Sequence, residues 1–204
     1  MEPLAATAMA DANMVASRAI SELEDMDALV RAEQRRIYRV LLAMVRDPEE
    51  ADSLTQECFL KAYQNRGRFR GECSLRTWLM RIAINLGRDH IKNRRWQFWR
   101  KLFHESAAAD ELDAVAASQA TPERSLLARE ALAHVWTAVD SLPTRQRAVF
   151  VLRFVEEMSI DEIAEATSLR PGTVKAHLSR ATGAIRQRVS APRQSHPAKE
   201  REKQ

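Results

Sequence analysis

Residues 159–185 read SIDEIAEATSLRPGTVKAHLSRATGAI, and this stretch decides the fold of the C-terminal half. Ser159 followed by Glu162 is a capping box, which predicts a short helix ending near residue 167. A turn over residues 168–170 follows, and Pro171 suits the first turn of a second helix that runs to about residue 188. Two short helices joined by such a turn form a helix-turn-helix. The alternative is a plain helical hairpin, and the agreement of cap, turn and apolar pattern argues against it.

The second of these helices has an apolar side and a polar side. Val174, Leu178 and Ala181 recur at helical spacing and predict the buried side. The opposite side of such a helix can enter the major groove of DNA, with its N-terminal residues at base edges. We predict that this face consists of Thr173, Ala176, His177 and Arg180, with Lys175 at its flank. Ser168 stands at the turn where a left-handed backbone favours Gly, and it should cost about 1 kcal/mol there.

A second set of features directed at nucleic acid lies near the middle of the chain. Ser74 can cap a long helix whose apolar stripe begins at Leu75. Polar residues follow along that helix at spacings of 4, 3, 4 and 3, which places them in one stripe: Arg81, Asn85, Arg88, Lys92 and Arg95. Aromatic residues, such as Trp96 and Trp99, come directly after it. Cations neutralise phosphates and aromatic rings stack on unpaired bases, so the pattern favours nucleic-acid binding over a merely solvated basic face.

The rest of the chain predicts an all-α protein of two small helical domains. Glycine occurs only 5 times among 204 residues, and no alternating strand pattern is present. Residues 104–121 contain no Lys or Arg and are rich in Ala and acids, which is typical of a linker. The predicted order is a disordered N-terminus (1–22), a first domain (23–101), an acidic flexible linker (102–125), a helix-turn-helix domain (126–190) and a disordered tail (191–204).

Composition also argues against several classes of protein. The excess of 32 basic over 28 acidic residues is by itself weak evidence for a polyanionic partner. No apolar run is long enough to span a membrane, so we predict a cytoplasmic protein that does not insert into membranes.

Cys58 and Cys73 show no metal-ligand spacing and are expected to be reduced thiols. No nucleophile-base pair, phosphate-binding glycine loop or metal cluster is evident, so we expect no enzyme activity, no cofactor and no metal.

Both halves of the chain resemble the extracytoplasmic-function (ECF) sigma factors of bacterial RNA polymerase. Residues 47–63, DPEEADSLTQECFLKAY, look like their polymerase-binding helix. Residues 69–71, FRG, with residues 77–85, TWLMRIAIN, resemble their −10 recognition segment. Three short motifs resemble their −35-binding domain: LP at 142–143, EIA at 162–164 and GTVK at 172–175. The resemblance covers roughly residues 23–100 and 126–188, and it implies a region 2 bundle followed by a region 4 helix-turn-helix.

The resemblance implies a role for each matching residue. One face would dock on the β′ clamp helices of core polymerase, and four residues would lie on it or beside it: Asp52, Gln56, Glu57 and Phe59. For Phe59, a contact in the core is a close alternative. The loop over residues 66–73, with Phe69, would cradle a base flipped out of the −10 element. Asn85 would hydrogen-bond to that base, unless Asn85 is only a surface residue. Arg81, Arg88, Lys92 and Arg95 would hold phosphates. The −35 element would be read by Arg170, Thr173, Lys175, Ala176, His177 and Arg180.

The expected function is therefore promoter recognition by a sigma factor that binds core RNA polymerase and helps to melt DNA. Partners implied by the resemblance are the β′ clamp helices and β flap of polymerase, promoter DNA, and an anti-sigma factor that could hold the protein at the membrane. A conventional helix-turn-helix repressor or activator is the alternative. The basic, aromatic helix of the first half and its Gln56-Glu57-Cys58-Phe59 motif argue against that alternative, because a sensor domain would not need them.

Overall fold

The computed structural model describes residue 23, residues 25–102 and residues 132–190, and for residues 95–102 it describes the backbone alone. Every regular element in these ranges is helical, which confirms the predicted all-α fold. The predicted N-terminal segment, almost all of the predicted linker and the predicted tail lie outside the described residues.

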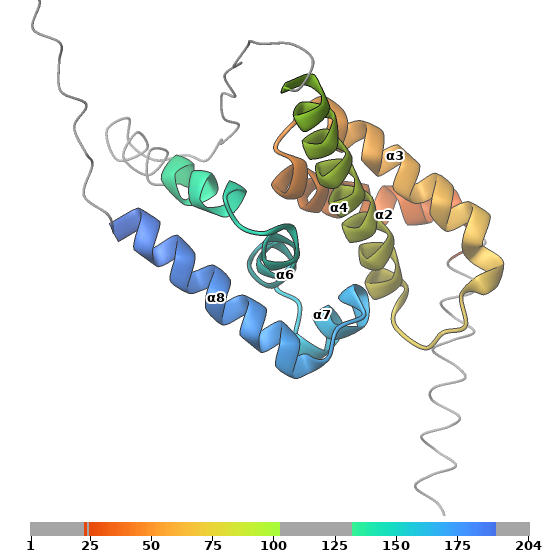
Figure 1. Cartoon of the computed structure of the whole chain (residues 1–204). Coiled ribbons are helices and arrows are strands. Elements are labelled where there is room, and N and C mark those ends of the chain that lie inside the picture. The colour runs from red at the N-terminus through yellow and green to blue at the C-terminus, as the bar shows by residue number, and fades with distance from the viewer. Residues whose placement is uncertain (1–22, 24, 103–131, 191–204) are drawn as a thin grey trace, which may run out of the picture.

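The helices form two groups, which are distinct in Figure 1. The first group contains α2 (Met26–Val45), α3 (Pro48–Asn65), the short 3₁₀ helix η1 (Arg66–Arg68) and α4 (Leu75–Leu102). The second group contains a helical stretch over residues 132–140, then α6 (Thr144–Phe154), α7 (Ile160–Thr167) and α8 (Pro171–Ser190).

Helix ends lie where the sequence places them. The Asp47 carboxylate accepts hydrogen bonds from the backbone N–H groups of Glu49 and Glu50, at 3.0 and 3.1 Å, and so caps α3. The capping box of α7 is complete, because Ser159 and Glu162 each accept from the other's backbone N–H, at 3.2 and 2.8 Å. Ser168 ends α7 with φ 55° and ψ 38°, the left-handed conformation expected at that turn.

One close approach sets how α2 packs on α4. A Cβ atom at Gly87 would lie 3.2 Å from the Cβ of Met44, tighter than side chains normally tolerate. Glycine at this position therefore lets the two helix backbones come together. The fully buried side chains on both sides of the contact include Ile37, Leu41, Met44, Met80 and Ile84.

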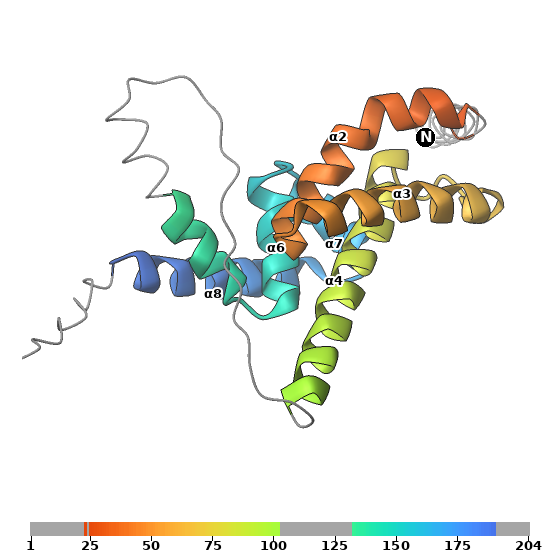
Figure 2. The same ribbon diagram turned by 90° about the horizontal axis from the view of Figure 1, so that it is seen from above.

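The second group of helices is packed directly against the first. Helix α7 contacts α4, and α6 contacts both α2 and α4. Buried residues of α6 and α7, such as Leu152 and Ile163, belong to the same continuous apolar cluster as those of α2–α4. Helix α8 lies on the far side of α6 and α7 from α4 in both views (Figures 1 and 2). This docking of the two groups is not encoded in any motif that the sequence displays.

Candidate nucleic-acid interface

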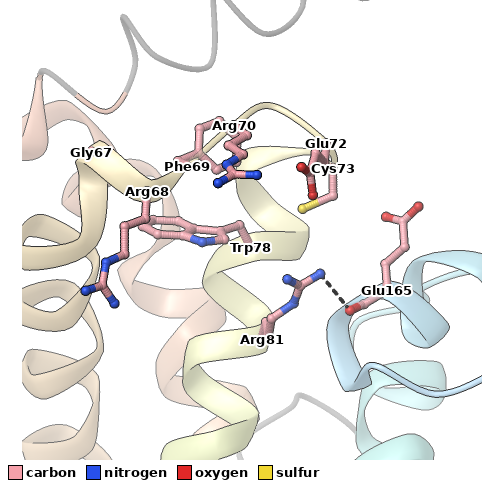
Figure 3. Close-up of a pocket in the computed structure, with 9 residues that line it drawn as sticks. All are labelled: Gly67, Arg68, Phe69, Arg70, Glu72, Cys73, Trp78, Arg81 and Glu165. Carbon is pink, nitrogen blue, oxygen red and sulfur yellow. Dashed lines mark hydrogen bonds between the residues drawn. The ribbon is translucent and has the colours of Figure 1, made fainter.

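A hollow of about 600 Å³ opens between the loop after η1, helix α4 and helix α7. Its walls are formed by Gly67, Arg68, Phe69, Arg70, Glu72, Cys73, Trp78, Arg81 and Glu165 (Figure 3). The rings of Phe69 and Trp78 have centroids 5.3 Å apart and are tilted by 58°. Phe69 is buried and Trp78 is partly exposed. The hollow therefore combines aromatic surface with several arginine side chains.

Trp78 is a lining residue that the sequence analysis did not assign to this site, whereas Arg68 and Arg70 belong to the loop that the resemblance assigned to it. In the sequence, Trp78 lies on the apolar stripe of its helix. That pattern predicts a buried side chain, so it does not show that part of the ring is exposed. The signal that could have found it is its position between the loop and the first basic residue of the stripe. Arg68 and Arg70 flank Phe69 in the sequence, and both are exposed.

Asn85 does not line this hollow. It is exposed and lines a neighbouring hollow of about 280 Å³, and Arg68 and Trp78 form part of both. Arg88 Nη1 lies 3.5 Å from Asn85 Oδ1, the outer limit of a hydrogen bond, so most of the amide's bonding capacity is free for a ligand. Trp78 thus lines both hollows, one together with Phe69 and the other together with Asn85.

The basic stripe of α4 is only partly open to solvent. Lys92 is exposed, and the side chain of Arg95 lies outside the described residues. Arg81 Nη2 donates a hydrogen bond to the backbone carbonyl of Glu165 in α7 at 2.9 Å (Figure 3). Arg88 lines a smaller hollow together with residues 167–169. Two of the predicted phosphate-binding residues therefore face α7.

Helix α3 presents a separate exposed face. Asp52 and Gln56 lie on it and are joined by a 2.9 Å hydrogen bond, while Glu57 pairs with Lys61 at 2.9 Å beside it. Phe59 is only 7% exposed and packs in the core, so it supports this face from beneath and does not form part of it. Phe59 and the preceding residue, Cys58, are both buried in this core.

Two apolar residues on the exposed face of α3 were missed from the sequence. Leu60 is 55% exposed and Tyr63 is 48% exposed. Leu60 follows Gln56 by four residues, so helical spacing alone places it on the same face. The guanidinium of Arg66 lies 4.0 Å from the centre of the Tyr63 ring and holds that ring at the end of the helix.

The predicted groove-facing side of α8 is present at the surface. Arg170, Lys175, Ala176 and Arg180 are exposed, and Thr173 and His177 are half-buried. Burial lowers the pKa of His177, and the nearby positive charges of Arg180 and Arg145 lower it further. His177 is therefore neutral at pH 7, and its Nδ1 is a buried atom without a hydrogen-bond partner in the part of the chain described.

Comparison with known proteins assigns both groups of helices. The family description "Sigma-70 region 2" matches residues 29–97, and "Sigma-70, region 4" matches residues 133–184. The ECF RNA polymerase sigma factor SigW of Bacillus subtilis is 30% identical over 171 residues, which are 81% of this chain and 90% of the relative. This protein belongs to the ECF sigma factors. It recognises promoters, and the reading as a conventional repressor or activator is not favoured.

A further relative and two solved structures agree with this assignment. The RNA polymerase sigma-H factor of Pseudomonas aeruginosa is 36% identical to this sigma factor over 160 residues, covering 78% of this chain and 83% of the relative. The sigma factor RpoE of Bartonella quintana, solved with the anti-sigma factor NepR, shares the fold with a TM-score of 0.63 at 16% identity, over 83% and 99% of the two chains. CnrH, solved with the cytosolic domain of CnrY, gives a TM-score of 0.58 at 22% identity, over 85% and 94%.

The part of this sigma factor that the structure describes holds neither a metal cluster nor a membrane-spanning helix. Among residues 23, 25–102 and 132–190, no group of three or more His, Cys, Asp or Glu side chains is arranged to hold a metal ion. None of the helices in these same ranges combines the length and apolar character needed to cross a membrane.

Proposed function

We propose that this sigma factor captures a flipped base of the −10 element in the hollow between Phe69, Trp78 and Arg81. The observation that carries the proposal is the geometry of that hollow, in which a partly exposed indole ring stands between arginine side chains. Flipping a base costs a few kcal/mol of stacking. Stacking on Trp78 and charge neutralisation by Arg68 and Arg70 would offset that cost and trap the melted strand.

Asn85 acts on the same strand from the neighbouring hollow, which Trp78 also lines. Its exposed amide can both donate to and accept from the edge of a base, which gives sequence preference in addition to stacking. Because it lines a separate hollow, Asn85 contacts either the far edge of the captured base or the base next to it. Lys92 and Arg95 continue the basic stripe and would bind phosphates of the adjoining DNA.

The exposed face of α3 is the proposed docking surface for core polymerase. Asp52, Gln56 and Glu57 supply polar contacts, and Leu60 supplies an apolar contact at the centre of the face. A mixture of apolar centre and polar rim is typical of protein interfaces. We assign the β′ clamp helices as its partner and the β flap as the partner of the region 4 unit.

The α8 face is the proposed reader of the −35 element. Its exposed cations, Lys175 and Arg180, suit phosphates and guanine edges, while the methyl group of Ala176 suits apolar contact with thymine. Two linked DNA-binding units raise the effective affinity for a promoter that carries both boxes at matching separation. Neither unit performs chemistry in this scheme, since the polymerase catalyses RNA synthesis.

We also propose that an anti-sigma factor regulates this protein in the cytoplasm. Two proteins of the same fold, RpoE of Bartonella quintana and CnrH, were solved with a bound protein partner, and that of RpoE is an anti-sigma factor. A partner of this kind would be expected to cover the exposed face of α3 or the DNA-binding surfaces.

Reconstitution with core polymerase tests the proposal as a whole. The purified protein is mixed with bacterial core polymerase and a library of genomic fragments, and transcript starts are sequenced. We expect starts that share two upstream boxes and require this protein. Duplex binding by the protein alone, with no stimulated starts, would contradict the proposal.

Asn85→Ala tests the −10 role directly. The substitution should weaken promoter opening, measured by permanganate reactivity of unpaired thymines, and leave binding to core polymerase unchanged. Asn93→Ala is the matched control, because Asn93 is exposed on the same helix but off the stripe. Equal loss of opening and of core binding in the Asn85 variant would remove Asn85 from the DNA interface.

A further inference from the structure

A buried carboxylate links the region 4 unit to the region 2 unit. Glu156, in the loop between α6 and α7, has a side chain that is only 3% exposed. Its two oxygens pair with Arg36 Nε and Arg39 Nη2 of helix α2, each at 2.9 Å. Both arginines belong to the other unit, so the pair bridges segments separated by more than 100 residues in the chain.

A second polar contact lies at the C-terminal end of α2. Arg147 of α6 donates a hydrogen bond to the backbone carbonyl of Met44 at 2.8 Å. It also contacts Asp140, by a hydrogen bond to the backbone oxygen and by an ion pair of 3.6 Å with the carboxylate. The Asp140 carboxylate in turn pairs with Arg46 Nε at 3.4 Å. The guanidinium of Arg46 stacks over Trp136, 4.9 Å from the ring centre.

These contacts favour one arrangement of the two units over others. A charge that is removed from water is costly unless a partner of opposite sign is present. If the units shifted against one another without separating, Glu156 would lose both of its cationic partners, and Arg147 would lose the Met44 carbonyl that accepts its hydrogen bond. The units are therefore expected either to dock in this register or to come apart and hydrate both side chains.

Docking covers one of the two proposed DNA-binding surfaces and leaves the other open. Helix α7 lies over α4, where Arg81 is hydrogen-bonded to the Glu165 carbonyl and Arg88 faces residues 167–169. Helix α8 lies on the opposite side of its unit, away from α4 (Figures 1 and 2). Its cations Lys175 and Arg180 are exposed in the docked arrangement.

We infer that the free sigma factor rests in a closed, self-inhibited state, in which the pairing of Glu156 with Arg36 and Arg39 holds α7 over the −10-binding surface of α4. The closed state binds a −35 duplex fully but the −10 strand only weakly, because Arg81 and Arg88 are engaged by the region 4 unit while the hollow at Trp78 stays open. Opening by core polymerase or by reversal of the Glu156 charge releases Arg81 and Arg88 for DNA. The assignment of these arginines to the −10 strand rests on the function proposed above, whereas the closed state itself does not.

Glu156→Arg in the full-length chain tests the inference. Small-angle X-ray scattering should show a larger radius of gyration than for the unmodified protein. Affinity for a single strand carrying the −10 sequence should rise about tenfold, because an apparent dissociation constant falls as the competent fraction grows. Affinity for the −35 duplex should stay unchanged, which also shows that the region 4 unit is folded.

Two further variants complete this test, one as a control and one as an independent way to open the protein. Glu157→Arg makes the same charge change at the neighbouring residue, whose side chain is exposed, and it should leave the radius of gyration and both affinities unchanged. Arg36→Glu with Arg39→Glu should open the protein from the other side. Combining these changes with Glu156→Arg should give less than the sum of the separate effects, because all three residues form one interaction.

The possible failures separate the inference from the proposed function. An unchanged radius of gyration in the Glu156→Arg protein would overturn the closed state, whatever the DNA affinities are. An expanded protein with unchanged affinity for the −10 strand would overturn the inhibition and leave promoter recognition through α8 intact. Absence of −10 binding in both forms, with expansion observed, would contradict the proposed −10 site and with it the inhibition.

Discussion

The two cysteines of this sigma factor differ in burial, and their reactivity is expected to differ accordingly. Cys58 Sγ is buried 3.8 Å from the backbone oxygen of Leu79, and burial raises its thiol pKa to about 12. At pH 8 only about one Cys58 in ten thousand is then a thiolate, which is the reactive form. Iodoacetamide should therefore modify Cys73, which is half-buried, well before Cys58. Mass spectrometry of a time course measures this order, and equal rates in the folded protein would contradict it.

Ser168 holds a left-handed backbone conformation that costs a residue with a side chain about 1 kcal/mol. Ser168→Gly should therefore raise the free energy of unfolding by about that amount, measured by urea denaturation. Ser179→Gly is the control, because Ser179 is exposed within α8, where glycine destabilises by roughly 0.5–1 kcal/mol. A loss of stability in the Ser168 variant would show that the serine contributes something that its backbone geometry does not reveal.

Sequence reasoning succeeded for single residues when their environment is local. The capping roles of Ser159 and Glu162 follow from neighbours within three residues, and the structure confirms them. The positions of Phe59 and Trp78 depend on which helix lies opposite. Phe59 therefore proved to be buried, and Trp78 proved to be partly exposed beside the loop. Their environments are set by packing that the local pattern does not contain.

At the level of a whole helix, the capping box makes the stability of α7 depend on pH. The backbone N–H of Ser159 donates to the Glu162 carboxylate and lowers its pKa below the ordinary 4.5. A lowered pKa means that the contribution is complete above pH 4.5 and is lost as the pH falls through the lowered value. Glu162→Gln should flatten this acid loss, measured by urea denaturation between pH 6 and pH 3. Glu165→Gln, the same change later in α7, should leave the loss as it is.

Helix α8 carries a further prediction about DNA. Arg180 is exposed on its proposed groove-facing side, with its Nε donating to the carbonyl of Ala176 at 3.1 Å. Arg180→Ala should weaken binding to a −35 duplex and lower the slope of log affinity against log salt by about 1, as loss of one phosphate contact does. Arg186→Ala removes the same charge further along the helix and should have a smaller effect. Unchanged affinity and slope would remove Arg180 from the interface.

The elements themselves were largely predictable from sequence, because several of the helices carry their own start signals. The starts of α4 and α7 follow from Ser74 and Ser159. The close packing of α2 on α4 was not predictable. In the sequence, Gly87 is only a residue that destabilises a helix, and the structure alone shows that Met44 packs directly against it. Contacts of this kind join residues that are far apart in the sequence, so helical periodicity does not predict them.

At the scale of the molecule, the sequence predicted two units but not their docking. The residues that dock them are far apart in the chain: Arg39 pairs with Glu156, and Arg147 reaches the carbonyl of Met44. None of these residues belongs to a motif, and a charged side chain on an amphipathic helix is normally read as solvated. Only the three-dimensional arrangement shows that the Glu156 carboxylate is almost fully buried, which turns an ordinary surface acid into a specific contact.

Docking through a shared apolar cluster predicts how the whole protein unfolds. Two units joined by buried contacts should unfold together, in one calorimetric transition. Arg147→Ala leaves the Met44 carbonyl of the other unit without its donor, so it weakens the interface, while Asp140 keeps its pair with Arg46. Differential scanning calorimetry should then show two transitions, while Arg186→Ala, remote from the interface, should keep one. A single transition in the Arg147 variant, shifted only in temperature, would mean that Arg147 stabilises its own unit without coupling it to the other.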